Sequence, residues 1–130
     1  MQDHSIEGLL DSPQKKLAFF QNLVIVATAD GVLDGQESKL LVEIGNKLGL
    51  TAEEAMPIAD NLDVLSFIIP EEGLQKTLEL QSLVLMMLQD GKIDDREYGL
   101  CVEYTRRIGY GVEILDDMIR QLAQNRSQSQ

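Results

Sequence analysis

The chain has 130 residues, with 22 Asp and Glu against 11 Lys and Arg, so its formal net charge is −11. This acidic excess argues against sequence-independent binding to nucleic acid or to anionic membranes, because both require clustered Lys and Arg, and it leaves cations and basic partners open. A chain of this length that is 44% hydrophobic and 25% charged suits one globular domain with its own hydrophobic core, and not a disordered tail.

The first residues predict an N-terminal arm over residues 1–11 that carries no export signal. Met1–Gly8 lacks both the basic segment and the apolar stretch of a secretory signal. The longest apolar run, Leu23–Ala29 with one Thr inside it, is far shorter than the roughly 20 residues of a membrane-spanning helix. The single cysteine, Cys101, rules out an intrachain disulfide, which fits a reducing compartment. We therefore expect a cytoplasmic protein without direct membrane insertion.

Three helices are predicted in the first half of the chain. The first spans residues 13–30, because Ser12 followed by proline is a favoured helix start and the chain then runs to Asp30 through a stretch that is apolar nearly all round between Leu23 and Ala29. The second follows Asp34 and ends at a glycine C-cap, Gly49. The third begins at Thr51–Glu54, where Thr followed three residues later by Glu is the signature of a capping box.

The same signals recur in the second half, at a distance of 60 residues. We expect a helix roughly over residues 71–90, a second between Asp94 and Gly109, and a third after Gly111. Sliding the chain by 60 residues without a gap makes 14 of the 47 aligned pairs identical, counted from Lys16/Lys76 to Leu62/Leu122. This agreement indicates an internal duplication.

The duplication predicts an all-α fold, a single helical-bundle domain of six or seven helices built from two pseudo-symmetric three-helix repeats. Two copies favour halves that share one core over an open solenoid, which needs more units. The domain should span residues 12–124, with repeat one at about 12–62, repeat two at about 71–124, a linker at 63–70, and a polar tail at 125–130. The expected core comprises Phe20, Leu23, Val24, Ala27, Leu83, Val84, Met87 and Leu88.

An acidic motif, Asp-Gly-x-hydrophobic-Asp-x-x-Glu, occurs at residues 30–37 and again at 90–97, each time between two predicted helices. It matches the second half of a calcium-binding EF-hand loop, but a true EF-hand is excluded because the ligand positions of the first half fall on largely apolar residues. Three carboxylates per loop could still hold a divalent cation, with calcium or magnesium the best fit to oxygen ligands. The candidate metal ligands are Asp30, Asp34, Glu37, Asp90, Asp94 and Glu97.

Helix capping alone is the alternative explanation of this motif. The glycine of each copy would end one helix, while Asp34 and Asp94 would N-cap the next, each with a Glu at the third helical position. Capping does not explain Asp30 and Asp90, because a carboxylate in the last turn of a helix opposes the helix dipole. A cation or a basic partner would remove that penalty, so both explanations stay open.

Other chemistries find no support in the residue pattern. A di-iron bundle needs Glu-x-x-His pairs, and the one histidine, His4, lies outside the repeat. Cys101 occupies an apolar helical position, which predicts a buried structural thiol and not a nucleophile. Zinc lacks the ligands it requires, and the Met86-Met87 pair, flanked by leucines, is expected to fill the core. We expect no enzymatic activity and no cofactor other than the divalent cation.

One family resemblance rests on the sequence around the first acidic motif. The residues are Ala29-Asp30-Gly31, followed by Glu37, Leu40, Leu41, Ile44 and Lys47-Leu48-Gly49-Leu50, and they resemble the TerB-like family, which is named for tellurite resistance. The resemblance covers roughly residues 15–122 and implies an all-helical bundle with an internal pseudo-twofold duplication. It also implies a divalent-cation site at the six carboxylates, since the acidic motifs of such proteins have been proposed to bind one. The second copy departs from the pattern at Gln89 and at Ile108-Gly109-Tyr110.

Two functions follow as expectations. The first is a noncatalytic module whose two acidic loops bind a divalent cation or a basic partner protein, in the tellurite or chemical stress response that the resemblance implies. The second is a structural protein–protein interaction domain without metal, in which the acidic motifs serve only as helix caps. In the second case an apolar face, either the segment of residues 63–70 or the helix that carries the Met pair, would contact the partner.

Overall fold

The computed structural model describes residues 6–29, 31, 35–89, 91 and 93–128, and within these ranges the structure is helical and has no strand. This confirms the predicted all-α class. Six helices have nine residues or more and a seventh is a single turn. In chain order they are α1 (Ile6–Leu9), α2 (Pro13–Ala27), α3 (Gly35–Leu48), α4 (Ala52–Asp60), a 3₁₀ turn η1 (Leu62–Val64), α5 (Gly73–Met87), α6 (Asp95–Arg107) and α7 (Val112–Gln128).

The predicted helix starts are confirmed where the structure describes them. The Ser12 hydroxyl accepts a hydrogen bond from the backbone N–H of Lys15 at 3.2 Å, and α2 begins with the following proline. At α4 the capping box is complete: Thr51 Oγ1 accepts from the Glu54 N–H at 3.2 Å, and Glu54 Oε1 accepts from the Thr51 N–H at 2.9 Å. These bonds satisfy backbone donors that the helix itself leaves free.

The C-terminal ends of the helices agree with the prediction for α3 and α6 but not for α2 and α5. Gly49 and Gly109, with φ of 73° and 89°, follow α3 and α6 and adopt the left-handed conformation of a glycine C-cap, as predicted. By contrast, α2 and α5 end at Ala27 and Met87, three residues earlier than expected. The predicted last-turn positions of Asp30 and Asp90 lie outside the described residues.

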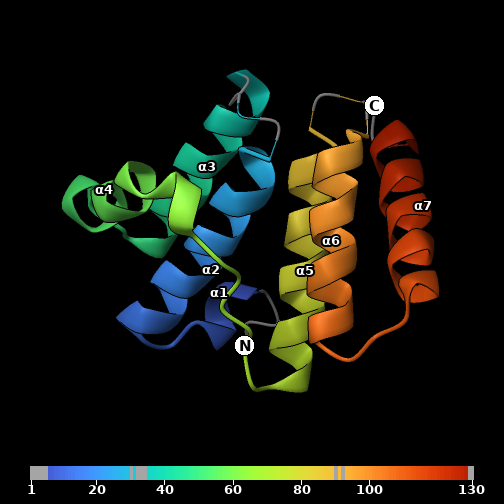
Figure 1. The fold of residues 1–130 in the computed structure, drawn as a ribbon, viewed down its shortest axis with the longest axis horizontal. Helices are drawn as coiled ribbons and strands as arrows, with labels where there is room; N and C mark the ends of the chain where they lie inside the picture. Colours follow the sequence, from blue (N-terminus) through green and yellow to red (C-terminus); the bar gives the residue numbers. More distant parts are fainter. Residues whose placement is uncertain (1–5, 30, 32–34, 90, 92, 129–130) are drawn as a thin grey trace.

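The central pair of the bundle is α2 and α5, which pack against each other (Figure 1). α3 packs on α2 and α6 packs on α5, while α4 and α7 lie at opposite ends of the molecule (Figure 1). The helices also follow a regular spacing along the chain. α5, α6 and α7 begin at residues 73, 95 and 112, sixty residues after the starts of α2, α3 and α4 at 13, 35 and 52.

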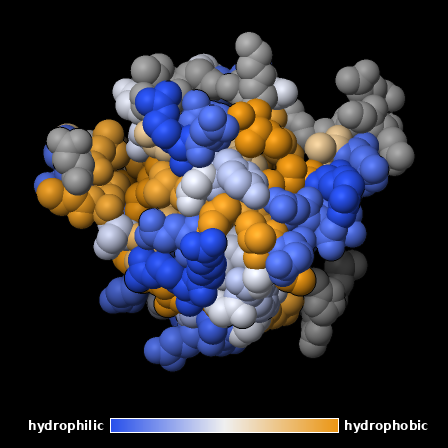
Figure 2. Space-filling view, turned by 45° about the vertical axis from the view of Figure 1, so that its right-hand side comes forward, coloured by the Kyte–Doolittle hydropathy of each residue, from blue (hydrophilic) through white to orange (hydrophobic). Residues whose placement is uncertain are grey.

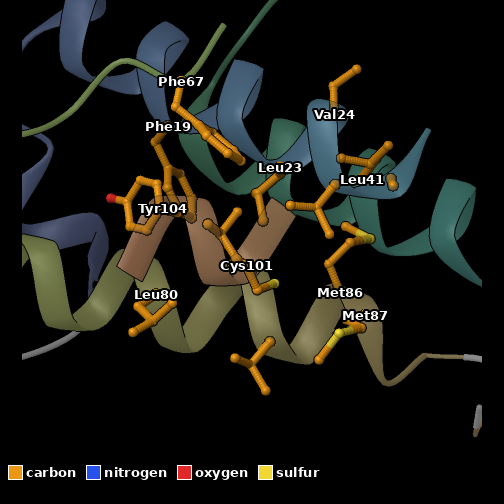
Figure 3. Close-up of a cluster of buried hydrophobic side chains, with 14 of the residues drawn as sticks. Phe19, Leu23, Val24, Leu41, Phe67, Leu80, Met86, Met87, Cys101 and Tyr104 are labelled. Carbon is orange, nitrogen blue, oxygen red and sulfur yellow. The ribbon is translucent and has the colours of Figure 1, made fainter. Parts of the chain in front are cut away.

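The core lies between the central helices and holds most of the expected side chains. Seven of them are buried: Leu23, Val24, Ala27, Leu83, Val84, Met87 and Leu88. Phe20 was expected there and is only half-buried, whereas its neighbour Phe19 is 2% exposed. Phe20 faces α3 instead, where a Cβ on Gly45 would lie 3.6 Å from its ring. Phe19 lies with Phe67 and Tyr104 at one end of the cluster, and Met86 and Met87 lie at the other (Figure 3).

The two ends of the described chain contribute more structure than expected. α1 lies within the predicted arm, and Leu10 just after it is 1% exposed and belongs to the core. At the other end, α7 continues to Gln128, into residues expected to form a polar tail. Of the helices that the structure describes, none has both the length and the apolarity to cross a lipid bilayer.

Candidate functional site

The acidic motifs are partly within the described residues. Glu37 and Glu97 stand in the first turns of α3 and α6 and are 4% and 3% exposed. Asp94 is the N-cap of α6. The remaining candidate ligands, Asp30, Asp34 and Asp90, lie outside the residues that the structure describes. Among the residues it does describe, no three His, Cys, Asp or Glu side chains are grouped so that they could hold a metal ion.

Asp94 has the capping role that the alternative explanation assigned to it. Its Oδ1 accepts hydrogen bonds from the backbone N–H groups of Arg96 at 2.8 Å and Glu97 at 3.3 Å. The Arg96 side chain lies 3.6 Å from the same oxygen. Burial acts to raise the pKa of Asp94, but the two N–H donors and the guanidinium together lower it. This carboxylate is therefore held in its charged form by helix capping.

A buried polar network around Glu79 is the feature that the sequence interpretation missed. Glu79 is 1% exposed, and its carboxylate accepts three side-chain hydrogen bonds. Gln75 Nε2 donates to Oε2 at 2.8 Å, while Asn22 Nδ2 and the Tyr104 hydroxyl donate to Oε1 at 3.1 and 3.2 Å. The network thereby joins α2, α5 and α6 through one carboxylate.

Asn22 extends the network to the segment that leads into α5. Its side chain donates to the carbonyl oxygen of Ile68 at 2.9 Å and accepts from the N–H of the same residue at 2.9 Å. Glu79 and Gln75 also line a cavity of about 350 Å³ between α2, residues 68–72 and α5. Burial raises the pKa of Glu79, although its three hydrogen-bond donors act to lower it.

A sequence signal for this network exists. Asn22 and Glu79 are polar residues inside the two predicted helices that carry the longest apolar stretches, and a buried polar side chain needs a partner. Glu79 also stands sixty residues after Phe19, so an aromatic position of one half is a carboxylate in the other. This mismatch within an otherwise similar pair of segments marks the site.

An apolar groove runs between α3 and α4 and is floored by Phe20 of α2. It consists of two hollows that share Phe20, Leu41 and Ala55. The inner hollow, of about 210 Å³, is also lined by Val24 and Ile58. The outer hollow, of about 390 Å³, continues along α3 past Val42 and Gly45 to the start of α4. We refer to the two hollows together as the α3–α4 groove.

Large apolar side chains are exposed on α3, on α4 and in the segment that follows α4, and two of them, Val42 and Leu62, line the groove. Val42 on α3 and Met56 on α4 are 59% and 56% exposed, and Leu62, Val64 and Ile68 in the segment after α4 are also exposed. Figure 2 shows apolar side chains gathered at the left edge of the molecule, on the side where α4 lies in Figure 1. An apolar patch of this kind, bordered by polar residues, is typical of a contact surface for another molecule.

Cys101 and the methionine pair have the structural roles that were predicted for them. Cys101 is fully buried, and burial, together with the nearby charge of Glu97, raises the pKa of its thiol to about 12. A thiol of this kind is protonated at neutral pH and is a poor nucleophile. Met86 and Met87 are fully buried in the core.

Searches of this chain against protein-family models, curated proteins and solved structures found no match.

Proposed function

We propose that this chain is a noncatalytic interaction module that binds a partner protein through the apolar surface formed by α3, α4 and residues 62–68. The observation that carries the proposal is the α3–α4 groove together with the exposed apolar side chains of the same elements and of the segment after α4. Removing apolar area from water contributes roughly 25 cal/mol per Å². Covering Val42, Met56 and Val64 would therefore favour association, whereas their exposure to water has no role in the fold.

The internal duplication is part of this proposal. The sixty-residue spacing between corresponding helix starts and the recurring glycines with positive φ at 31 and 91 and at 49 and 109 support a bundle made of two pseudo-symmetric three-helix repeats. Such a bundle, with the acidic motifs at corresponding turns, agrees with the TerB-like resemblance. A cytoplasmic role in the response to tellurite or a related chemical stress is the context that this resemblance adds.

A divalent cation bound by the acidic loops is the second candidate function. It is favoured by the position of Glu37 and Glu97, which are both buried carboxylates in the first turn of a helix that follows an acidic loop. Each stands six residues after a glycine with positive φ, Gly31 or Gly91. Calcium or magnesium fits such oxygen ligands best. The capping contacts of Asp94 count against a free ligand at that position.

Thermal unfolding with millimolar calcium, magnesium, manganese or zinc tests the second candidate. A ligand that binds only the folded state stabilises it by RT ln(1 + [L]/Kd), which is about 2.7 kcal/mol at a hundredfold excess over Kd. We expect a shift in Tm that is lost in Asp30→Asn and Asp90→Asn. Unchanged melting with all four ions would exclude the cation, and a shift that survives both substitutions would place it elsewhere or attribute it to charge screening.

Site-specific photocrosslinking in the cells that make the protein tests the first candidate. A photoreactive residue is placed at Met56 on α4 or at Val64 after it, both exposed, and at Gln121, an exposed position on α7, as the matched control. We expect one partner adduct from both Met56 and Val64, absent at Gln121 and reduced by Leu62→Glu. Adducts that are the same at all three positions, or that Leu62→Glu leaves unchanged, would contradict the proposal.

A further inference from the structure

We propose that the occupant of the α3–α4 groove is an amphipathic α-helix of a partner protein with a basic polar face. This inference rests on the proposed interaction function and specifies the chemistry of the partner. The inference rests on a difference between the two ends of the molecule. At one end α7 covers α5 and α6, whereas at the other end α4 leaves the α3–α4 groove uncovered among the described residues.

α7 shows what a well-covered helix pair looks like in this fold. It has 17 residues and packs on both α5 and α6. On its inner face Leu115 is fully buried, and Met118, Ile119 and Leu122 are partly buried against the core. Their spacing of three, four and seven residues from Leu115 is the apolar stripe of an amphipathic helix.

α4 does not provide the same cover for α2 and α3. It has nine residues, contains Pro57 and packs chiefly on α2. At a rise of about 1.5 Å per residue it is roughly half the length of α7. Sixty residues before the buried Leu115 the chain has Ala55, which lines both hollows of the groove. Among the residues that the structure describes, the space that a leucine fills at one end of the molecule is therefore open at the other.

The shape of the groove favours a helix over a small ligand. Its inner hollow of about 210 Å³ is smaller than the roughly 300–1,000 Å³ of most small-molecule sites, and it is lined by apolar side chains such as Val24, Leu41 and Ile58. It suits one anchoring Leu, Ile or Met. The longer outer hollow along α3 suits the flank of the helix that carries this anchor, which is the helix-in-groove mode of recognition.

The charge around the groove indicates the polar face of the partner helix. Residues 35–62, which form both walls, contain five acids and two bases. Glu43, Glu53 and Asp60 are exposed, and the whole chain has a net charge of −11. A basic helix would be steered to this surface, while an acidic helix would be repelled. A second copy of this chain is equally acidic and is a worse electrostatic match.

Binding of a fluorescent peptide to the full chain tests this inference. The probe is residues 112–125 of this chain, the helix that covers α5 and α6, with Glu113→Lys, Asp116→Lys and Asp117→Lys to make it basic. Its control carries Leu115→Ser in addition and has the same charge. We expect fluorescence anisotropy to show saturable binding of the probe and at least tenfold weaker binding of the control peptide.

Two variants of the chain test whether the probe binds in the α3–α4 groove, and a third is the control at a distant position. Ala55→Leu should fill the inner hollow and weaken binding at least tenfold, with a melting temperature no lower than that of the wild type. Val42→Glu, at an exposed position that the fold does not need, should also weaken binding, although its added negative charge would strengthen purely electrostatic attraction. Gln121→Leu adds a leucine at an exposed position of α7 and should leave binding unchanged.

Four results would overturn the inference. They are absence of probe binding, equal binding of the two peptides, binding that Ala55→Leu and Val42→Glu leave unchanged, and self-association of the chain that Ala55→Leu abolishes. The last would make a second copy the occupant. If the crosslinks from Met56 and Val64 persist when the probe fails to bind, the interaction function stands and only the basic helix is wrong. If the crosslinks fail as well, both are wrong.

Discussion

Replacing Glu79 tests whether the buried network holds the bundle together through one carboxylate. In Glu79→Ala, the Tyr104 hydroxyl and the Gln75 amide both lose the acceptor that they have in the structure. Asn22 keeps its bond to the carbonyl of Ile68. The result is a fully buried Tyr104 hydroxyl without a partner and a small void beside it.

The expected loss in the free energy of unfolding depends on which of the hydrogen-bond donors can bind water instead of Glu79. An unsatisfied buried donor costs about 1–3 kcal/mol. Gln75 lines the cavity of about 350 Å³, so its amide can be hydrated, while Tyr104 is 0% exposed. Counting chiefly the Tyr104 hydroxyl, Glu79→Ala should lower the free energy of unfolding by about 2 kcal/mol. Glu79→Gln keeps one acceptor oxygen, and a rotated Gln75 amide can accept from the new amide, so its loss should be about 1 kcal/mol or less.

The pH dependence of stability distinguishes the carboxylate from its amide. Burial raises the folded-state pKa of Glu79 above the ordinary 4.5. Below pH 4.5 the group is protonated in both states. As pH rises from 4.5 through the raised folded pKa, the unfolded chain ionises first, so wild-type stability falls, and above that pKa the effect is constant. Glu79→Gln lacks this decline.

Urea unfolding of the wild type and Glu79→Gln between pH 4 and pH 8 measures this effect. The titrations of other groups, such as Asp94, are common to both proteins and cancel in the difference between their free energies of unfolding. We expect the difference, wild type minus Gln variant, to decrease as pH rises above 4.5. A difference that is independent of pH, or a Gln variant as unstable as the Ala variant, would refute the role assigned to Glu79.

Three further predictions concern Cys101, Thr51 and Gly109. The Cys101 thiol, with its pKa raised to about 12, should resist alkylation at pH 8 until denaturant is added; rapid reaction of the native protein would contradict its burial. Thr51→Ala removes half of the capping box and should cost about 1 kcal/mol in urea unfolding, whereas no loss would mean that the cap is not formed in solution. Gly109→Ala, at φ 89°, should cost about 1–2 kcal/mol because an L side chain disfavours this conformation, and a neutral effect would argue against the left-handed turn after α6.

Features of the fold that depend on nearby residues could be predicted from the sequence. Ser12 followed by proline, Thr51 with Glu54, and the glycines at 49 and 109 each act within a few residues, and the structure has helix boundaries at all of them. The apolar helices were also predicted, since a run of apolar residues is visible in a short window of sequence. Their predicted ends, at residues 30 and 90, were three residues later than the observed ends at Ala27 and Met87, because helix ends are weakly specified by pattern alone.

The network and the groove depend on tertiary packing and could not be predicted. Asn22, Ile68, Glu79 and Tyr104 are far apart in the sequence and meet only once the helices pack. The groove arises because Ala55 stands where the other half has a leucine and because α4 is short, and only the packing of the described residues shows the hollow that results. Three of the six candidate metal ligands, Asp30, Asp34 and Asp90, lie outside the described residues, so the cation stays a prediction.

Methyl NMR during titration with the basic α7-derived peptide tests the central claim, that a partner helix binds between α3 and α4. Val42 and Ile58 line the groove, while Ile93 and Ile114 are exposed apolar residues in the second half of the chain and act as controls. We predict that the methyl signals of Val42 and Ile58 shift in a saturable manner and that those of Ile93 and Ile114 do not. Shifts confined to Ile93 and Ile114, or shifts of equal size at all four residues, would contradict the claim.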